Sequence, residues 1–280
     1  MIKMTDVTFA YKNKPPLFSE LNLQISDGNI YGLLGKNGAG KTTLLKIICG
    51  LLFPQQGTCS VLAFLPSGRI PEMLQEIYFI PEEIYTPPLK MDEYLKLFAP
   101  FYPRFDHRSF GQYIKTFDLP RNDRLTSLSY GQKKKFLVAF GLATNCRLLI
   151  LDEPTNGLDI PSKSQFRKLL AASLSEDRTV IISTHQVRDI GNLIDPIVIL
   201  DDGKVIFNQS IDDISRKLAV RLQKTEPGKD EVLYSEKTLG GYVVIDENRG
   251  ESESNLDIEL LFNAVINNQQ HMSELFTREA

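Results

Sequence analysis

Residues 30–48 read IYGLLGKNGAGKTTLLKII, and this stretch decides the fold class. Its first five residues form an apolar run typical of a buried strand, and its last six are typical of a helix. Between them, Gly35–Thr42 matches G-x-x-x-x-G-K-[ST] at every fixed position. A strand, a glycine-rich loop and a helix in this order predict an α/β domain whose backbone amides hold phosphate groups at the start of the helix.

The residue types of this loop suit nucleotide chemistry. Its glycines let the backbone approach phosphates closely, Lys41 is expected to reach the β- and γ-phosphates, and the Thr42 hydroxyl is expected to bind Mg²⁺. A glycine-rich turn without a ligand would leave the Lys-Thr pair unexplained. We therefore predict nucleotide binding by seven residues of this segment, namely Gly35, Asn37, Gly38, Gly40, Lys41, Thr42 and Thr43.

A second apolar run ends in two carboxylates. Residues 148–159 read LLILDEPTNGLD, and the first four side chains are all aliphatic, as in a parallel strand buried on both faces. Ligands of open α/β sheets lie beyond the carboxyl ends of the strands. We therefore expect Asp152 to hold Mg²⁺, directly or through water, and Glu153 to orient and deprotonate the water that attacks the γ-phosphate.

Together with LSYGQ at residues 128–132, these stretches resemble the nucleotide-binding subunits of ATP-binding cassette (ABC) transporters, most of all the stand-alone ATPase subunits of ABC-2 or efflux-type exporters. The resemblance implies a P-loop NTPase α/β core, with a mostly parallel sheet flanked by helices, an antiparallel β subdomain, a helical subdomain and a small C-terminal α/β extension. It implies that Glu153 is the catalytic base and that Asp159 lies in a nucleotide-contacting D-loop. It also implies a homodimer, or a pair of homologous subunits, in which the LSYGQ segment of one copy binds the ATP of the other. The residues of that segment implied in the contact are Ser129, Gly131 and Gln132.

The Ser129 segment also has a structural interpretation. Ser-x-x-Gln is a capping box, so Ser129 is expected to cap a helix that runs through Phe136–Phe140. Both interpretations can hold together, because Gly131 falls in the first turn of that helix, where glycine costs up to about 1 kcal/mol relative to alanine. Tyr130 stands where the family has another glycine, and its side chain is expected to point away from the phosphate.

Two further candidates follow buried strands. His185 comes after the apolar run 179–184, where a lone histidine is commonly structural, but the order Ser-Thr-His matches the family's switch histidine, which contacts the γ-phosphate and steadies the base. After the run 77–80 the family usually carries a glutamine that touches Mg²⁺ and the attacking water, whereas this chain has Pro81-Glu82. We predict that Glu82 takes this place, and the alternative is that Glu82 is a solvated loop charge. The predicted catalytic residues are thus Glu153, His185, Lys41 and Glu82, and the predicted metal ligands are Thr42, Asp152 and Glu82.

Tyr11 is a candidate for stacking on adenine. The family carries an aromatic residue on its first strand at about this distance upstream of Lys41. Phe9 points to the same side of a strand, so either aromatic side chain can instead belong to the core. Both interpretations stay open at this point.

Composition narrows the class of protein. The 280 residues carry a formal net charge of −3, which gives no electrostatic basis for binding nucleic acid. Cys49, Cys59 and Cys146 are too few and wrongly spaced for a disulfide framework or a zinc site, and we expect a cytoplasmic protein. No apolar run approaches the roughly 18 residues of a membrane span, so a membrane-spanning part is expected to be another polypeptide. The run Lys133–Lys135 is interpreted as a solvated helix face, and a local phosphate role is the alternative.

The pattern predicts a nucleotide-binding domain over residues 1–220 and a small extension over residues 221–280. Residues 1–30 alternate like antiparallel strands, and residues 83–145 show helical spacing. Further elements are expected at Asp92–Phe101, Ser109–Phe117, Ile211–Val220 and Leu256–Ile266 (helices), at Thr225–Lys229 (a linker), and on both sides of Gly240-Gly241 (strands). Aromatic residues of the helical region are expected mainly in its core, with some lining a groove for a membrane partner: Tyr94, Phe98, Phe101, Tyr102, Phe105 and Phe110.

The resemblance implies a cycle in which ATP binding closes two subunits and hydrolysis separates them. Through an integral membrane permease, on the inner face of the cell membrane, this cycle would drive transport, and by analogy export. One alternative is a cassette ATPase that acts on DNA or ribosomes without a membrane partner, but such proteins usually carry two cassettes or a long coiled-coil insertion. A subunit that only binds nucleotide is the other alternative, and Glu153 and His185 argue against it.

Overall fold

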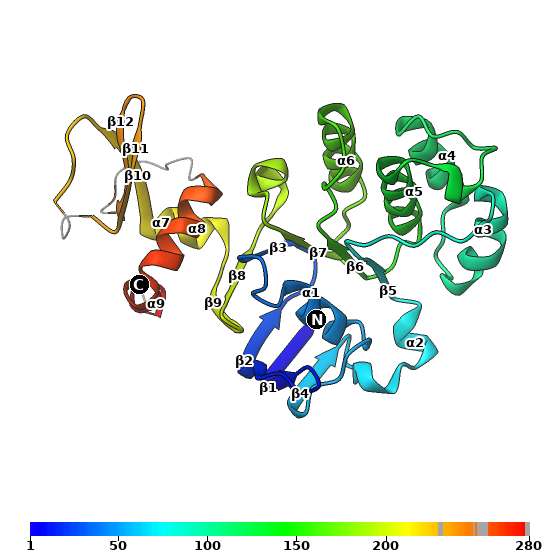
Figure 1. Ribbon diagram of the computed structural model, residues 1–280, viewed down its shortest axis with the longest axis horizontal. Coiled ribbons are helices and arrows are strands. Elements are labelled where there is room, and N and C mark those ends of the chain that lie inside the picture. The colour runs from blue at the N-terminus through cyan, green and yellow to red at the C-terminus, as the bar shows by residue number, and fades with distance from the viewer. Residues whose placement is uncertain (229–231, 249, 251–256, 278–280) are drawn as a thin grey trace.

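A six-stranded central sheet organises the chain (Figure 1). The computed structural model describes residues 1–228, 232–248, 250 and 257–277. The strand order is β5-β6-β7-β3-β8-β9, in which the first five strands are parallel and β9 is antiparallel to β8. The strands are β3 (Ile30–Leu34), β5 (Ile77–Ile80), β6 (Leu148–Asp152), β7 (Thr179–Thr184), β8 (Ile197–Asp201) and β9 (Lys204–Gln209).

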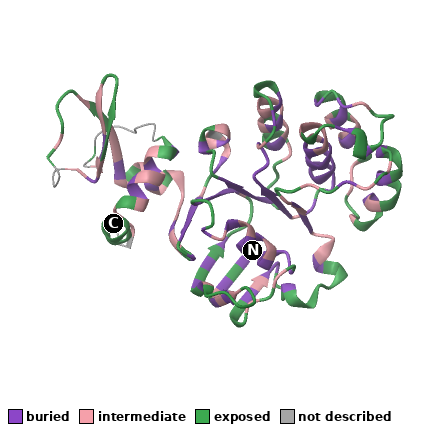
Figure 2. Ribbon diagram, viewed as in Figure 1, coloured by how far each residue is buried: buried purple, intermediate pink, exposed green. Residues whose placement is uncertain are grey.

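The aliphatic runs of these strands are explained by burial on both faces of the sheet (Figure 2). Along β6, Leu149 and Leu151 join a core with the helices on one face, whereas Leu148 and Ile150 join a second core on the other. The helices of the first face include α5 (Tyr130–Ala143) and α6 (Ile160–Ala172), and α1 (Lys41–Ile48) lies on the second. Because successive strand side chains point to opposite faces, an unbroken apolar run fills both cores.

A three-stranded antiparallel sheet covers α1 from the outside, and the alternating pattern of residues 1–30 predicts two of its strands. It consists of β1 (Ile2–Ala10), β2 (Pro16–Ile25) and β4 (Gln56–Val61), in the order β2-β1-β4. Its inward side chains, such as Met4 and Phe18, are buried together with Leu44 and Leu45 of α1. This packing holds the Gly35–Thr42 loop between two sheets.

Helices dominate residues 83–145, in agreement with the predicted spacing. They are α3 (Met91–Phe98), a short 3-10 turn (Ala99–Phe101), α4 (His107–Thr116) and α5, and they follow the short helix α2 (Pro71–Leu74). Among the aromatic residues of this region, Tyr94 and Phe110 are buried, whereas Phe101 is 67% exposed. No helix of the described residues is long and apolar enough to cross a membrane.

The predicted helix at Ile211–Val220 is too long. Helix α7 (Ile211–Lys217) ends before Leu218, which is extended, and residues Leu218–Gln223 form strand β10. These residues adopt the strand conformation instead of the helical one because β10 pairs along its length with β12 (Gly241–Glu247) and buries Leu218 completely. Strand β12 also pairs with β11 (Tyr234–Thr238), and helices α8 (Ile258–Asn267) and α9 (Gln269–Thr277) follow. Two predicted positions, Lys229 and Leu256, lie outside the described residues.

Candidate active site

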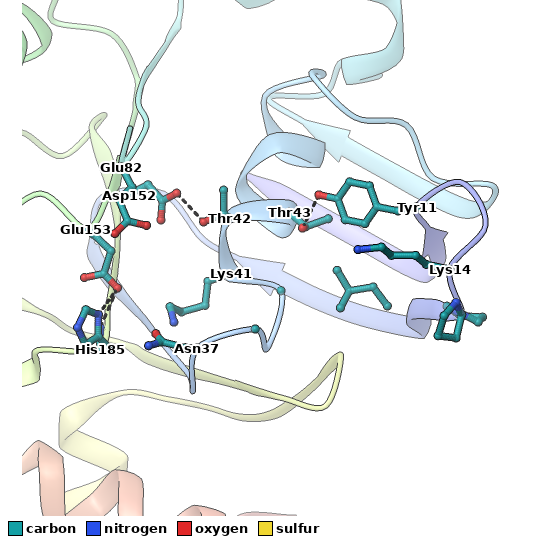
Figure 3. Close-up of a pocket in the computed structure, with 15 residues that line it drawn as sticks. Tyr11, Lys14, Asn37, Lys41, Thr42, Thr43, Glu82, Asp152, Glu153 and His185 are labelled. Atoms are coloured by element: carbon teal, nitrogen blue, oxygen red, sulfur yellow. Dashed lines mark hydrogen bonds and ion pairs between the residues drawn. The ribbon is translucent and has the colours of Figure 1, made fainter. Parts of the chain in front are cut away.

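A pocket of about 670 Å³ opens where the carboxyl ends of β3, β6 and β7 meet (Figure 3). Its walls come from the β1–β2 connection, the glycine-rich loop with the start of α1, the segment after β5, and the ends of β6 and β7. Eleven of the residues predicted from the sequence line it: Tyr11, Asn37, Gly38, Gly40, Lys41, Thr42, Thr43, Glu82, Asp152, Glu153 and His185. The topology thus brings together segments that are far apart in the chain.

The glycine-rich loop needs its glycines for different reasons. Gly38 and Gly40 have φ angles of +83° and +104°, and a Cβ on Gly40 would lie 2.7 Å from the ring of Phe18. Gly35 has no positive φ, but a Cβ there would lie 2.4 Å from the carbonyl oxygen of Leu200. The backbone of the loop therefore stays bare beside the pocket, where phosphate oxygens can approach its amides.

Lys41 is one of two lysines that line the pocket, together with Lys14. Its side chain is mostly buried, and its ammonium donates to the carbonyl oxygens of Gly35 (2.7 Å) and Lys36 (3.3 Å). Burial lowers the pKa of Lys41, and the nearby carboxylates, chiefly Glu153 and Asp152, oppose that shift. A buried ammonium beside carboxylates and bare amides forms a suitable place for the negative charges of a polyphosphate.

Asp152 and Thr42 form an oxygen pair at the base of the pocket. The Thr42 hydroxyl donates to Asp152 Oδ2 at 2.7 Å, and the Ser183 hydroxyl donates to Asp152 Oδ1. Among the described residues there is no group of three or more His, Cys, Asp or Glu side chains that could enclose a metal by themselves. A carboxylate and a hydroxyl fit Mg²⁺, which is usually held by one or two carboxylates plus phosphate oxygens and water.

Glu153 sits in an unusual backbone conformation and is held from several sides. Its φ angle is +47°, in the left-handed region. Its Oε1 accepts from the backbone amide of His185 at 3.0 Å and lies 2.7 Å from His185 Nδ1, and its Oε2 accepts from the Thr184 hydroxyl at 3.2 Å. The carboxylate and the imidazole therefore face the pocket as a joined pair, a geometry suited to orienting a water molecule.

Glu82 lines the pocket, but its carboxylate is partly engaged elsewhere. Its Oε1 accepts from Asn156 Nδ2 at 3.3 Å, and its main-chain carbonyl accepts from the Tyr130 hydroxyl at 2.7 Å. The ring of Tyr130 lies over Gly157, where a Cβ would be 2.7 Å from the tyrosine. The Tyr130 side chain therefore extends along its own chain toward Glu82.

The two aromatic residues of β1 and its end have different surroundings. Phe9 is only 5% exposed and belongs to the core, whereas Tyr11 is 41% exposed and lines the pocket. The Tyr11 hydroxyl lies 2.9 Å from Thr43 Oγ1, and its ring meets Phe9 edge-on at 5.0 Å. Tyr11 thus offers a ring beside the glycine-rich loop, and Pro15 and Pro16 also line the pocket.

The remaining predicted residues do not line the pocket of this chain. Ser129 and Gln132 form the predicted capping box at the start of α5, with bonds of 2.9 and 3.2 Å. Asp159 is exposed and caps α6, and the bonds from Ser162 lower the pKa of its carboxyl. Gly131 lies against Gly157, where a Cβ would be 2.8 Å from the carbonyl oxygen. Apart from Gly35, which belongs to the glycine-rich loop but does not line the pocket, the predicted residues outside the pocket therefore lie at the starts of α5 and α6.

The interpretation of Lys133–Lys135 as a solvated face is wrong for Lys134. Lys134 is fully buried, and so are all residues of α5 from 136 to 143, which shows that this helix lies inside the fold. Its ammonium donates to the carbonyl oxygen of Glu153 at 2.5 Å, and burial lowers its pKa to about 8. Sequence reasoning missed this residue because a run of three lysines resembles a charged surface, and only the place of the helix in the fold separates the middle one.

Comparison with known proteins agrees with this geometry. The family model described as "ABC transporter" matches residues 18–156. The chain is 30% identical over 224 residues to the ABC transporter ATP-binding protein NatA of Bacillus subtilis, covering 76% of this chain and 91% of NatA. It is 31% identical over 222 residues to the bacitracin transport ATP-binding protein BcrA of Bacillus licheniformis, covering 78% of this chain and 72% of BcrA. Among solved structures, a dimeric bacterial ABC transporter cassette matches with a TM-score of 0.66 at 25% identity, covering 75% of this chain and 99% of that cassette.

Proposed function

The chain belongs to the ABC transporter family, and we propose that it is an ATP-hydrolysing subunit of a transporter. Two copies of the chain would close around two ATP molecules, and this closure would power transport by a separate membrane protein. The observation that carries the dimer proposal is the separation of the site. The pocket holds the predicted phosphate, metal and base residues, but Ser129, Gly131 and Asp159 lie outside it. A second copy, facing the first, would supply Ser129 and Gly131 from the start of its own α5 and Asp159 from the start of its own α6.

Within each pocket the proposed roles follow from the contacts. Lys41 and the loop amides bind the phosphates of ATP, and the Tyr11 ring lies where it can stack on adenine. Thr42 and Asp152 would bind Mg²⁺, a role that their mutual hydrogen bond beside the phosphate loop supports, and Glu82 lines the same pocket. When bound, Mg²⁺ would neutralise the phosphate charge.

Hydrolysis is proposed to begin at Glu153. Its carboxylate takes a proton from the attacking water, and the bond from the His185 amide keeps the carboxylate oriented while the imidazole faces the γ-phosphate side of the pocket. Loss of the γ-phosphate removes the group that Ser129 and Gly131 of the other copy would bind. The two copies then separate, because the binding energy that held them together depends on the intact triphosphate.

A membrane partner is proposed from the named relatives, since NatA is an ABC transporter ATP-binding protein and BcrA is a bacitracin transport ATP-binding protein. The protein would then lie on the cytoplasmic face of the membrane through that partner. The helical region offers a surface for it, because Tyr85, Leu97 and Phe101 are 83%, 55% and 67% exposed. Export, rather than uptake, stays a prediction from the sequence resemblance.

A complementation experiment tests the shared site. Lys41→Ala damages the pocket, and Ser129→Glu places a carboxylate where the γ-phosphate of the other copy is expected. In a mixed dimer both changes fall in one site and the other site is intact. Random mixing makes half of the dimers mixed, so independent sites would recover about one quarter of wild-type ATPase activity.

The control is a mixture of Lys41→Ala with Glu153→Gln. Both residues line the same pocket, so each site of that mixed dimer carries one defect and no activity should return. Recovery in the first mixture alone supports the shared site. No recovery in either mixture, from variants that are each folded, would refute it.

A further inference from the structure

Lys134 is a buried cation without a carboxylate bonded to its ammonium. It lies in α5, is 0% exposed, and its bonded partner is the main-chain carbonyl of Glu153, at 2.5 Å. Glu82, Glu153 and Asp152 are near enough to act on its charge, but none of their carboxylates forms an ion pair with it. Burying an ammonium is costly, so a lysine at this place requires a compensating role.

The carbonyl that Lys134 binds belongs to the residue proposed as the catalytic base. Glu153 has a φ angle of +47°, which a residue with a side chain adopts only when its surroundings hold it. Its amide donates to the Ser183 carbonyl at 3.0 Å, and its own carbonyl also accepts a weaker turn bond from the Asn156 amide at 3.3 Å. The bond from Lys134 is therefore the short one that fixes the peptide following Glu153.

The ring of Tyr130 lies beside the ammonium of Lys134. The Lys134 ammonium lies 5.4 Å from the centre of the Tyr130 ring, within the range of a cation–π interaction. The Tyr130 hydroxyl donates to the Glu82 carbonyl at 2.7 Å, which anchors the ring beside the segment after β5. Because Lys134 is 0% exposed, the bond between its ammonium and the Glu153 carbonyl lies away from water, which strengthens that bond.

We propose that Lys134 is a positioning residue for hydrolysis: from α5 it holds the main chain of Glu153 in the left-handed conformation that aims the carboxylate into the pocket. This inference rests on the proposed role of Glu153 as the base. Lys134 itself is not among the residues that line the pocket. Its effect is therefore expected on the rate of hydrolysis and not on the affinity for ATP.

The test uses the full chain with Lys134→Met, which keeps an unbranched apolar side chain but removes the donor. Lys133→Met is the matched control, since Lys133 is the neighbouring lysine of the same helix and is not buried. We expect kcat to fall roughly tenfold to a hundredfold in Lys134→Met, as for a displaced catalytic group, with KM for ATP within about twofold. Lys133→Met should match the wild type.

A double mutant separates positioning from a general structural effect. If Lys134 acts through the Glu153 carboxylate, Lys134→Met should cause little further loss of single-turnover rate in a Glu153→Gln background. ATP affinity by calorimetry shows that each variant is folded, and Lys134→Gln, whose side chain is shorter and polar, replaces Lys134→Met if the latter does not fold. The same fall in kcat is expected from it.

Three outcomes would overturn the inference. They are an unchanged kcat in the folded variants, a loss of ATP affinity that parallels the loss of kcat, and an equal loss of rate with and without the Glu153 carboxylate. A wild-type chain that binds ATP but shows no hydrolysis that depends on Glu153 would instead refute the proposed function.

Discussion

Replacing Glu153 with glutamine removes the proposed base while disturbing the fold little. The carboxylate accepts from the His185 amide at 3.0 Å and from the Thr184 hydroxyl at 3.2 Å. A glutamine oxygen can keep the first bond, and its amide group can donate to the Thr184 oxygen, so the cost in folding free energy should stay below about 1 kcal/mol. What is lost is proton transfer, which is worth about 10²- to 10⁴-fold in rate, or roughly 3–5 kcal/mol.

The assay has two readouts for this variant. Phosphate release should fall by about 10²- to 10⁴-fold, and static light scattering in ATP and Mg²⁺ should show twice the monomer mass, because unhydrolysed ATP holds two copies together. Glu176→Gln, an exposed glutamate far from the pocket, is the control and should behave like the wild type. A monomer in saturating ATP would contradict the two-copy site, and a fall in turnover of less than about threefold would contradict the role of Glu153 as base.

Three further outcomes are expected. Gly131→Ala should weaken ATP-driven dimerisation by roughly tenfold while a single chain keeps its ATP affinity by calorimetry, because the added Cβ would lie 2.8 Å from the Gly157 carbonyl and displace the start of α5; dimerisation at wild-type strength would contradict this. Glu82→Gln should keep or raise turnover in the phosphate assay, and a hundredfold loss would show that the carboxylate has a specific task. For Lys134, burial lowers the pKa from 10.5 to about 8, so between these pH values the unfolded chain binds more protons than the folded chain. The free energy of unfolding of the wild type should therefore rise relative to that of Lys134→Met as pH rises from 8 to 10.5. Denaturant unfolding at both pH values measures this, and the same difference between the two proteins at both would contradict it.

Local chemistry made much of the fold predictable. The strand, loop and helix around Gly35–Thr42 carry their own signals, and so does the capping box of Ser129, whose two bonds span only three residues. The unbroken aliphatic run of β6 indicated burial on both faces for the same reason. Each of these features is decided by residues that are close together in the chain.

The features that were missed depend on distant partners. Residues Leu218–Gln223 became a strand because their partners in β12, 19 to 29 positions later, supply the pairing backbone. Helical spacing alone therefore misplaced the end of α7. Lys134 is a core residue because α5 packs across the central sheet. A run of three lysines gives no sign of that packing. Likewise, only the fold separates Phe9, in the core, from Tyr11, at the pocket.

The two departures from the usual family motifs form one structural unit. In the sequence, Tyr130 in place of glycine and Glu82 in place of glutamine are independent oddities, 48 positions apart. In the fold, the Tyr130 hydroxyl holds the Glu82 carbonyl, and the Glu82 carboxylate is bonded to Asn156, which follows the β6 motif. A side chain at position 130 is therefore accommodated because it extends toward Glu82. The same contact secures the segment after β5, which carries Glu82, against the start of α5, which Ser129 caps. One hydrogen bond thus connects part of the pocket with the start of that helix.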